Sequence, residues 1–423
     1  MSAPKFLTFR SNNSNSIRFI IVTSYVISLI LFGFLMSPPK EIFTGILNIL
    51  TQRDTLITDY IGVGGMGAAF VNAGVLTLIF IYIIYKLKIH FNGLTIASLF
   101  LIAGFSLFGK NLFNIWFIVL GVYLYSIFQK ESFSKYIYVA LFGTAMAPMV
   151  TEIMLSSSLP SKIRIPLGIL IGIGVGFILP PLSSYLVKVH NGFNLYNVGF
   201  AAGMIGTILV SILKSYGFSQ SPRLVWTSGN NTILSVYLYI MFLSMILIGF
   251  LLNNKSFKGV KNITTYAGRL ITDFTILEGF NPALINMGIN GVLSTTYVLI
   301  VNGDLNGPTI AGIFTIVGFS AVGKHPKNIL PIFLGVFLGS LTKVWSLNDP
   351  SILLAALFGT ALAPIAGEFG WKCGVLAAFI HSSVVLNVGV LHGGLNLYNN
   401  GFAAGIVAAV LVPLIEAFKK EEY

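Results

Sequence analysis

The stretch HNGFNLYNVGFAAG at residues 190–203 recurs almost unchanged as HGGLNLYNNGFAAG at residues 392–405. Three other blocks recur in the same order: LITDY at 56–60 as LITDF at 270–274, NGLTIA at 92–97 as NGPTIA at 306–311, and ALFGTAMAP at 140–148 as ALFGTALAP at 356–364. Self-similarity of this kind is the signature of internal duplication. We therefore predict two homologous membrane repeats, at residues 1–216 and 217–423.

The composition is that of a membrane protein. Of the 423 residues, 55% are hydrophobic and 9% are charged, against roughly 25% charged in a soluble domain. This composition excludes a soluble enzyme and a nucleic-acid-binding domain. A secreted disulfide scaffold is also excluded, because Cys373 is the only cysteine. The net charge of +12 is spread over short loops, as in proteins whose cations orient helices in the bilayer.

Each half contains seven apolar segments. They lie near 17–36, 63–86, 93–108, 112–128, 137–155, 164–187 and 196–215 in the first half, and near 231–252, 280–301, 308–323, 328–345, 351–367, 371–391 and 400–418 in the second. A straight crossing needs roughly 20 residues, so the third segment of each half is short enough to be tilted or re-entrant. We predict an all-α polytopic fold with ten to fourteen crossings.

An odd number of segments per half predicts that the two repeats have inverted topologies. The positive-inside rule points the same way, because about two thirds of the 25 lysines and arginines lie on one side if both termini are cytoplasmic. The strongest contribution comes from the central loop with Lys255, Lys258, Lys261 and Arg269. We therefore expect a multi-pass protein of the cell (inner or plasma) membrane with cytoplasmic N- and C-termini.

Matched glycines and prolines predict broken helices in both repeats. The second segment opens with a glycine-rich stretch at 62–67 and with Gly279-Phe280-Asn281-Pro282, and the fifth carries Pro148 and Pro364. In inverted-repeat transporters such interruptions mark the solute site near the middle of the membrane.

Two matched pairs of carboxylates are candidate ion- or substrate-binding residues. Glu152 and Glu368 follow the prolines of the fifth segments by four residues, and Asp59 and Asp273 precede the broken second segments. An ionisable residue inside a span is costly and is by default a functional candidate. The alternatives are a helix-end carboxylate for the glutamates and a helix N-cap for the aspartates.

Amide side chains repeat as well. Asn72 and Asn286 fall within apolar spans, where an amide must find hydrogen bonds, either to another helix or to a solute.

The 190–203 and 392–405 blocks contribute Asn194 with Asn396 and Tyr196 with Tyr398. These residues suit a turn that caps the last helix of each half, and they equally suit a vestibule that contacts the solute.

Two lysines end a phosphate-loop-like pattern. Residues 104–110 and 318–324 both match Gly-x4-Gly-Lys, but Asn111 and His325 stand where such a loop has Ser or Thr. We therefore favour Lys110 and Lys324 snorkelling to the membrane interface, with an anionic-substrate site as the alternative. The sequence contains no metal or cofactor motif, so we expect neither.

The repeated HxGxNLYNxGFAAG and LFGTAxAP blocks resemble the bacterial membrane family called domain of unknown function 1576, over nearly the whole chain. The order of elements is also similar to that of urea transporters, which are channels made of two inverted repeats. The first resemblance implies no substrate, and the second implies a pore for a small neutral solute.

Taken together, these patterns predict a membrane transport protein rather than an enzyme. We favour an ion-coupled secondary transporter for a small polar or ionic solute that works by alternating access, with H⁺ or Na⁺ bound at Glu152 and Glu368. The alternative is a urea-transporter-like channel. The expected partners are the lipid bilayer and the solute, with no nucleic acid, and assembly into a homo-oligomer is left open.

Overall fold

The computed structural model describes residues 5–155, 160–218 and 223–420, and its regular elements there are all helices. The first repeat comprises α1 (Lys5–Met36), α2 (Pro39–Leu50), α3 (Tyr60–Gly64), α4 (Met66–Lys86), α5 (Gly93–Phe105), α6 (Trp116–Phe128), α7 (Ile137–Gly143), α8 (Ala147–Leu155), α9 (Ser161–Leu186) and α10 (Asn197–Ser215). The second comprises α11 (Asn231–Leu252), α12 (Val260–Ile263), α13 (Phe274–Leu277), α14 (Phe280–Ile300), α15 (Gly307–Phe319), α16 (Pro326–Thr342), α17 (Pro350–Gly359), α18 (Ala363–Phe369), α19 (Trp371–Val388) and α20 (Asn399–Lys420).

The two sets of helices correspond one to one, which confirms the all-helical fold with two repeats. Each predicted apolar segment coincides with a helix, or with a pair of helices joined by a 3₁₀ turn at Thr144–Met146 or Thr360–Leu362. Within the described residues, ten helical stretches are long and apolar enough to cross a membrane, and α5, α6, α15 and α16 are shorter. The count therefore falls within the predicted range.

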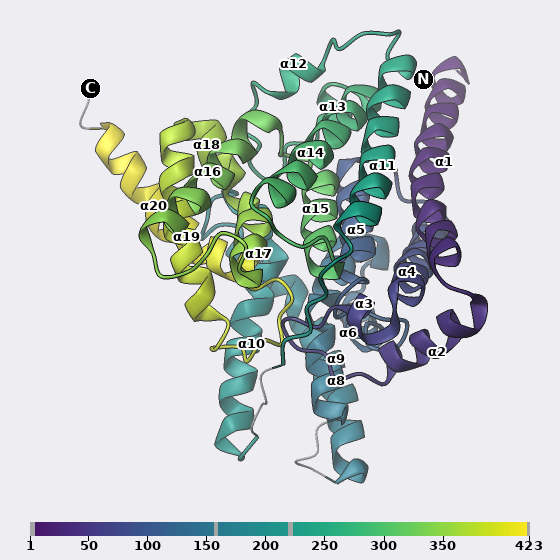
Figure 1. The fold of residues 1–423 in the computed structure, drawn as a ribbon, viewed down its shortest axis with the longest axis vertical. Coiled ribbons are helices and arrows are strands. Elements are labelled where there is room, and N and C mark those ends of the chain that lie inside the picture. The colour runs from purple at the N-terminus through teal and green to yellow at the C-terminus, as the bar shows by residue number, and fades with distance from the viewer. Residues whose placement is uncertain (1–4, 156–159, 219–222, 421–423) are drawn as a thin grey trace.

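The repeats run in opposite directions (Figure 1). Helix α1 descends to α2 in the lower half of the molecule, whereas its counterpart α11 rises to α12 at the upper end. The breaks in the second segments also correspond, since Gly65 and Gly279 separate α3 from α4 and α13 from α14 at φ values of +83° and +97°. Glycine adopts this conformation without the steric penalty of a Cβ atom.

Helices α5 and α15 cross each other at the centre of the molecule. Each has 13 residues and is about 20 Å long at 1.5 Å per residue, which is too short to span the hydrocarbon core. A Cβ atom on Gly104 would lie 2.8 Å from Ala311 Cα, and one on Gly318 would lie 3.1 Å from Ala97 Cα. Small residues therefore let the two backbones approach closely.

The repeated 190–203 and 392–405 blocks form a second crossing, between α10 and α20. A Cβ atom on Gly199 would lie 2.6 Å from Tyr398 Cβ, and one on Gly401 would lie 2.9 Å from Tyr196 Cβ. One turn further along, Gly203 faces Phe402 and Gly405 faces Phe200. Each repeat thus supplies glycines that accommodate the aromatic rings of the other, which explains why this motif occurs twice.

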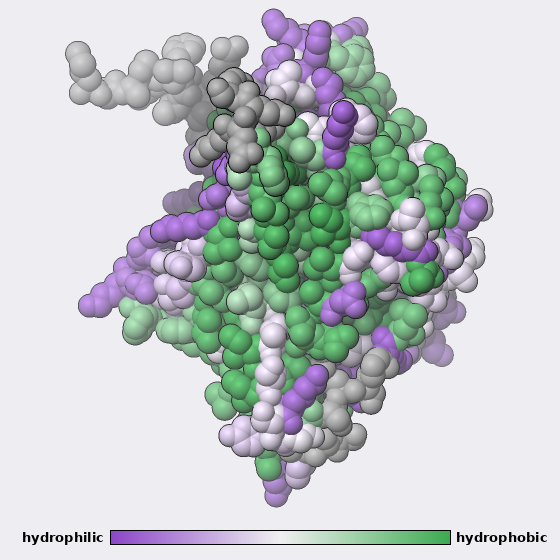
Figure 2. All heavy atoms as spheres, turned by 90° about the vertical axis from the view of Figure 1, so that its left-hand side faces the viewer, coloured by the Kyte–Doolittle hydropathy of each residue, from purple (hydrophilic) through white to green (hydrophobic). Residues whose placement is uncertain are grey.

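The outer helices face lipid. In α1, α9 and α11, only 28% to 33% of the most apolar window is buried inside the protein, against 89% across α7 and α8. The face shown in Figure 2 is hydrophobic over most of its central area, with hydrophilic side chains toward its ends and margins. Ordinary soluble surfaces do not carry such large apolar areas, so the chain is a multi-pass membrane protein in contact with the bilayer.

The crossing of α10 and α20 predicts a matched pair of glycine substitutions. In Gly203→Val the new Cβ atom would lie 2.2 Å from Phe402 Cγ, whereas a Cβ atom on Gly174 of α9 meets nothing within 4 Å. Overpacking of this kind typically costs about 1–3 kcal/mol. We expect thermal unfolding in detergent to show a lower melting temperature for Gly203→Val and little change for Gly174→Val. Equal melting temperatures would contradict the crossing.

Candidate functional site

The two matched aspartates tie the repeats together. Asp59 accepts hydrogen bonds from the backbone N–H of Ile61 (3.0 Å), at the start of its own helix α3, and of Gly307 (3.1 Å), at the start of α15 in the other repeat. A third N–H, from Thr227, lies 3.2 Å from Asp59 Oδ2. The carboxylate therefore caps two helices at once, a position favoured by the helix dipole.

Asp273 makes the reciprocal arrangement. It accepts from Thr275 N (2.9 Å) in its own repeat and from Gly93 N (2.9 Å) at the start of α5 in the other. Both aspartates are buried. Their hydrogen-bond partners make them N-caps that join the two repeats, which is the helix N-cap alternative predicted from the sequence.

Asn72 and Asn286 fix the segments that follow α5 and α15. Asn72 Nδ2 donates to the carbonyls of Ser106 (2.7 Å) and Lys110 (3.0 Å). Asn286 Nδ2 donates to those of Ser320 and Lys324, both at 2.8 Å. Both amides are fully buried and leave Oδ1 without a hydrogen-bond partner. They therefore orient the two lysine-bearing turns inside the protein.

Lys110 and Lys324 are fully buried, so the prediction that they snorkel to the interface is wrong. The physical reason is that α5 and α15 are short, so that these turns end inside the protein. Lys324 Nζ donates to Tyr196 Oη and to Thr360 Oγ1 (2.7 Å). Lys110 Nζ has no hydrogen-bond partner in the described part of the chain and lies 5.0 Å from the centroid of the Phe105 ring.

These lysines belong to one continuous group at the repeat interface. The Phe105 ring that contacts Lys110 packs on Tyr398 at a centroid distance of 4.9 Å, and Tyr398 packs on Tyr196 at 5.4 Å. Tyr196 in turn packs on Phe319 at 5.0 Å, and Lys324 Nζ lies 5.4 Å from the Phe319 centroid. We call this group the lysine–tyrosine cluster, which comprises Lys110, Phe105, Tyr398, Tyr196, Phe319 and Lys324.

Asn194 and Asn396 position the tyrosines of this cluster. Asn194 Oδ1 accepts from Tyr196 N (2.9 Å), and Asn194 Nδ2 donates to the carbonyl of Gly401 in the other repeat (2.9 Å). Asn396 does the same with Tyr398 N (3.0 Å) and Gly199 O (3.3 Å). The turn that was expected from the motif is therefore present, and it holds both tyrosine rings against each other.

The matched glutamates are in different environments. Glu152 is fully buried and forms an ion pair with Arg53, whose Nε lies 3.0 Å from Glu152 Oε2. Glu368 is exposed, and Ala267 stands at the position equivalent to Arg53. The two carboxylates do not share a pocket, so only Glu152 has the environment of a functional residue.

A second buried acid accompanies Glu152, and the sequence reasoning missed it. Asp54 is fully buried and accepts hydrogen bonds from Tyr60 Oη (2.9 Å), Thr151 Oγ1 (3.0 Å) and Asn114 Nδ2 (3.2 Å). Gly268 occupies the equivalent position in the second repeat. An unmatched acid beside a repeated block was the only available signal.

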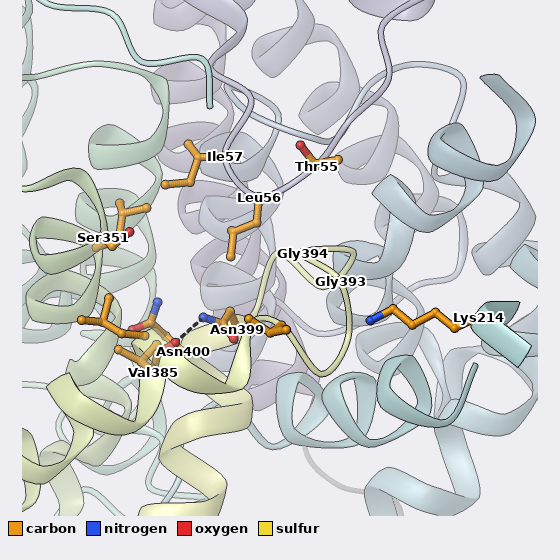
Figure 3. Close-up of a pocket in the computed structure, with 14 residues that line it drawn as sticks. Thr55, Leu56, Ile57, Lys214, Ser351, Val385, Gly393, Gly394, Asn399 and Asn400 are labelled. Atoms are coloured by element: carbon orange, nitrogen blue, oxygen red, sulfur yellow. Dashed lines mark hydrogen bonds between the residues drawn. The ribbon is translucent and has the colours of Figure 1, made fainter. Parts of the chain in front are cut away.

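Two cavities are lined by residues that directly follow members of the lysine–tyrosine cluster in the sequence. The first, of about 420 Å³, is lined by residues of both repeats, among them Thr55, Lys214, Asn399 and Asn400 (Figure 3). Asn399 directly follows Tyr398.

The second cavity, of about 630 Å³, is lined by Tyr266, His325, Lys327, Gly367 and Trp371, among others. Its wall includes the residue that follows Lys324. Residues 55–57 of the first cavity follow α2 and residues 264–266 of the second follow α12, and these two helices lie in opposite halves of the molecule (Figure 1).

Comparison with known proteins identifies the family. The family model described as "Protein of unknown function (DUF1576)" matches residues 38–215 and 252–417. The match covers most of the chain and falls in both repeats, so the chain belongs to this family. No curated protein and no solved structure matches it.

The double capping by Asp59 predicts a large loss of stability on its removal. Asp59→Ala leaves three backbone N–H groups without their acceptor, and we expect the free energy of unfolding to fall by about 2 kcal/mol or more. Asp349→Ala is the control, because Asp349 Oδ2 accepts from Ser346 N in an exposed loop, and it should change stability by less than about 0.5 kcal/mol. Denaturation in mild detergent measures both, and equal effects would argue against a bridge between the repeats.

Proposed function

We propose that this member of the DUF1576 family is a transport protein that moves a small polar or ionic solute across the membrane. The observation that carries the proposal is the buried polar group at the repeat interface, together with one cavity lined by the residue after Tyr398 and another lined by the residue after Lys324. Solute sites of secondary transporters typically lie where broken helices of inverted repeats meet.

The asymmetry between the repeats supports alternating access. In the first repeat, the Arg53–Glu152 ion pair and the Asp54 network hold the 51–59 segment against α8. In the second repeat, Ala267, Gly268 and Gly367 occupy the positions equivalent to Arg53, Asp54 and Thr151, so the ion pair and the acid network have no counterpart there, and Gly367 lines the second cavity. We infer that the ion pair closes one side of the pathway and breaks when that side opens.

Coupling to H⁺ or Na⁺ is the favoured energy source. A buried carboxylate that must exchange its arginine partner for a proton or a cation would link ion binding to the opening of this side. Within this proposal Glu152 is the coupling residue, whereas the exposed Glu368 is not. We further propose that the protein resides in the cell membrane with its N- and C-termini in the cytoplasm, on the distribution of its cations.

Transport in proteoliposomes tests the proposal and separates it from the channel alternative. Vesicles with and without the protein are loaded asymmetrically, and uptake of ¹⁴C-labelled urea, glycine, acetate and lactate is followed under an inward pH or Na⁺ gradient. Accumulation above the external concentration that collapses when the gradient is dissipated supports coupled transport. Uptake of urea that is linear with concentration and indifferent to gradients supports the pore. No protein-dependent flux of any of these solutes, nor of chloride or formate, would contradict the proposal.

Glu152→Gln and Glu368→Gln form a matched pair of variants. Removal of the Glu152 charge leaves Arg53 without its partner, and we expect gradient-driven accumulation to fall by at least about fivefold, the effect of a lost coupling free energy of about 1 kcal/mol. The exposed Glu368 should tolerate the same change with uptake within about twofold of the original protein. Both variants are checked for monodisperse elution in detergent. Equal activities for the two would show that the Arg53–Glu152 pair has no part in coupling.

A further inference from the structure

We propose that the lysine–tyrosine cluster binds small monovalent anions, one at each lysine, and that the transported solute is an anion of this class. The inference rests on the proposed transport function and names its substrate. Its first support is that two ammonium groups are buried without a carboxylate. Arg53–Glu152 and Lys135–Glu131 are the ion pairs among the described residues, and Lys110 and Lys324 take part in neither.

Two residues that contact the Phe105 ring carry unpartnered donors. Lys110 Nζ and Tyr398 Oη are both fully buried and without a hydrogen-bond partner in the described chain. Both residues contact the same ring, that of Phe105. An ammonium group only donates, and a phenol has a hydrogen to donate. These two groups therefore match an acceptor with negative charge.

The second lysine has neutral partners only. Lys324 Nζ is held by the hydroxyl groups of Tyr196 and Thr360 and by the faces of the Tyr196 and Phe319 rings. Hydroxyl dipoles and ring faces compensate only part of the cost of removing an ammonium ion from water. An anion supplies the missing charge, and the hydroxyl groups can rotate to donate to it.

The linings of both cavities carry positive charge and no acidic residue. Lys214 reaches toward the Gly393–Gly394 loop of the first cavity (Figure 3), and Lys327 lines the second. Asp and Glu are absent from the residues described as lining either cavity. Positive potential in a low-dielectric cavity concentrates anions, so both cavities favour the same charge as the cluster.

The geometry also favours small, singly charged ions. The Tyr196 and Tyr398 rings pack against each other between the two lysines, so each ammonium group has its own surroundings and a large polyanion cannot engage both. Chloride, nitrate, formate and acetate fit this description, whereas sulfate and phosphate bring more charge than one lysine neutralises.

Binding is tested on the full-length protein in detergent, in a sodium gluconate buffer. Sodium chloride, nitrate or formate replaces gluconate at constant Na⁺, and the melting temperature is followed. We expect a saturable rise for the original protein and for Lys343→Met. The latter is a matched control, because Lys343 Nζ also lies over an aromatic ring, that of Phe379, but bonds to Phe379 O and Ser382 Oγ outside the cluster. In the double variant Lys110→Met/Lys324→Met, the apparent affinity for these anions should be at least tenfold weaker.

A second variant, Tyr398→Phe, keeps the inference testable if the double variant fails to fold. Tyr398→Phe keeps both lysines and all ring contacts but removes one unpartnered donor, so anion binding should weaken while the protein remains monodisperse. If the melting temperature of the original protein shows no saturable dependence on any of the three anions, the inference is overturned. A dependence that is unchanged in Lys110→Met, Lys324→Met and Tyr398→Phe would place the anion elsewhere and overturn it as well.

Flux measurements separate this inference from the proposed function. Uptake of ³⁶Cl⁻ or ¹⁴C-formate that requires both lysines supports the two together. Saturable anion binding without flux of any solute would support the anion-binding site and contradict the transport proposal. The double variant Lys110→Met/Lys324→Met could also take up urea or glycine at the rate of the original protein and without anion dependence. That result would support the transport function and contradict the anion as its substrate.

Discussion

The structure depends on hydrogen bonds and close contacts that each repeat makes to the other. Asp59 caps the central helix of the second repeat and Asp273 caps that of the first, since their carboxylates accept from Gly307 N and Gly93 N. These N–H groups at helix starts have no partner within their own helices, and in the interior of a membrane protein an unsatisfied donor is costly. Neither repeat can therefore complete its central helix alone, and the pseudo-symmetric pairing of the two is enforced.

The same pairing creates the polar centre. The helices α5 and α15 are short enough to end inside the protein, so the turns that carry Lys110 and Lys324 are buried at the interface instead of reaching water. Asn72 and Asn286 hold the backbones of these turns, whereas neither lysine side chain has a carboxylate partner among the described residues. A protein that maintains two such groups bears a cost of several kcal/mol each. This is the physical reason to look for function there.

The sequence was sufficient to predict the architecture, but not the buried lysine–tyrosine cluster at the repeat interface. Repeated blocks and segment counts predicted the duplication, the inverted helical fold and the breaks near Gly65 and Gly279 because these follow from local patterns. The burial of Lys110 could not be foreseen, since an apolar segment that ends in lysine normally ends at the interface. The difference between Glu152 and Glu368 depends on Arg53, which is distant in sequence and has no counterpart. Local patterns carry no information on such long-range partners.

The most direct test of the inverted pairing is the accessibility of two equivalent positions, Thr44 in α2 and Lys258 before α12. Both are exposed, and Figure 1 places α2 in the lower half of the molecule and α12 at its upper end. In a Cys373→Ser background, Thr44→Cys and Lys258→Cys are each treated with a membrane-impermeant maleimide in right-side-out and inside-out vesicles. Inverted repeats predict that the two cysteines react from opposite sides of the membrane. Reaction of both from the same side would contradict the inverted fold and the central site that depends on it.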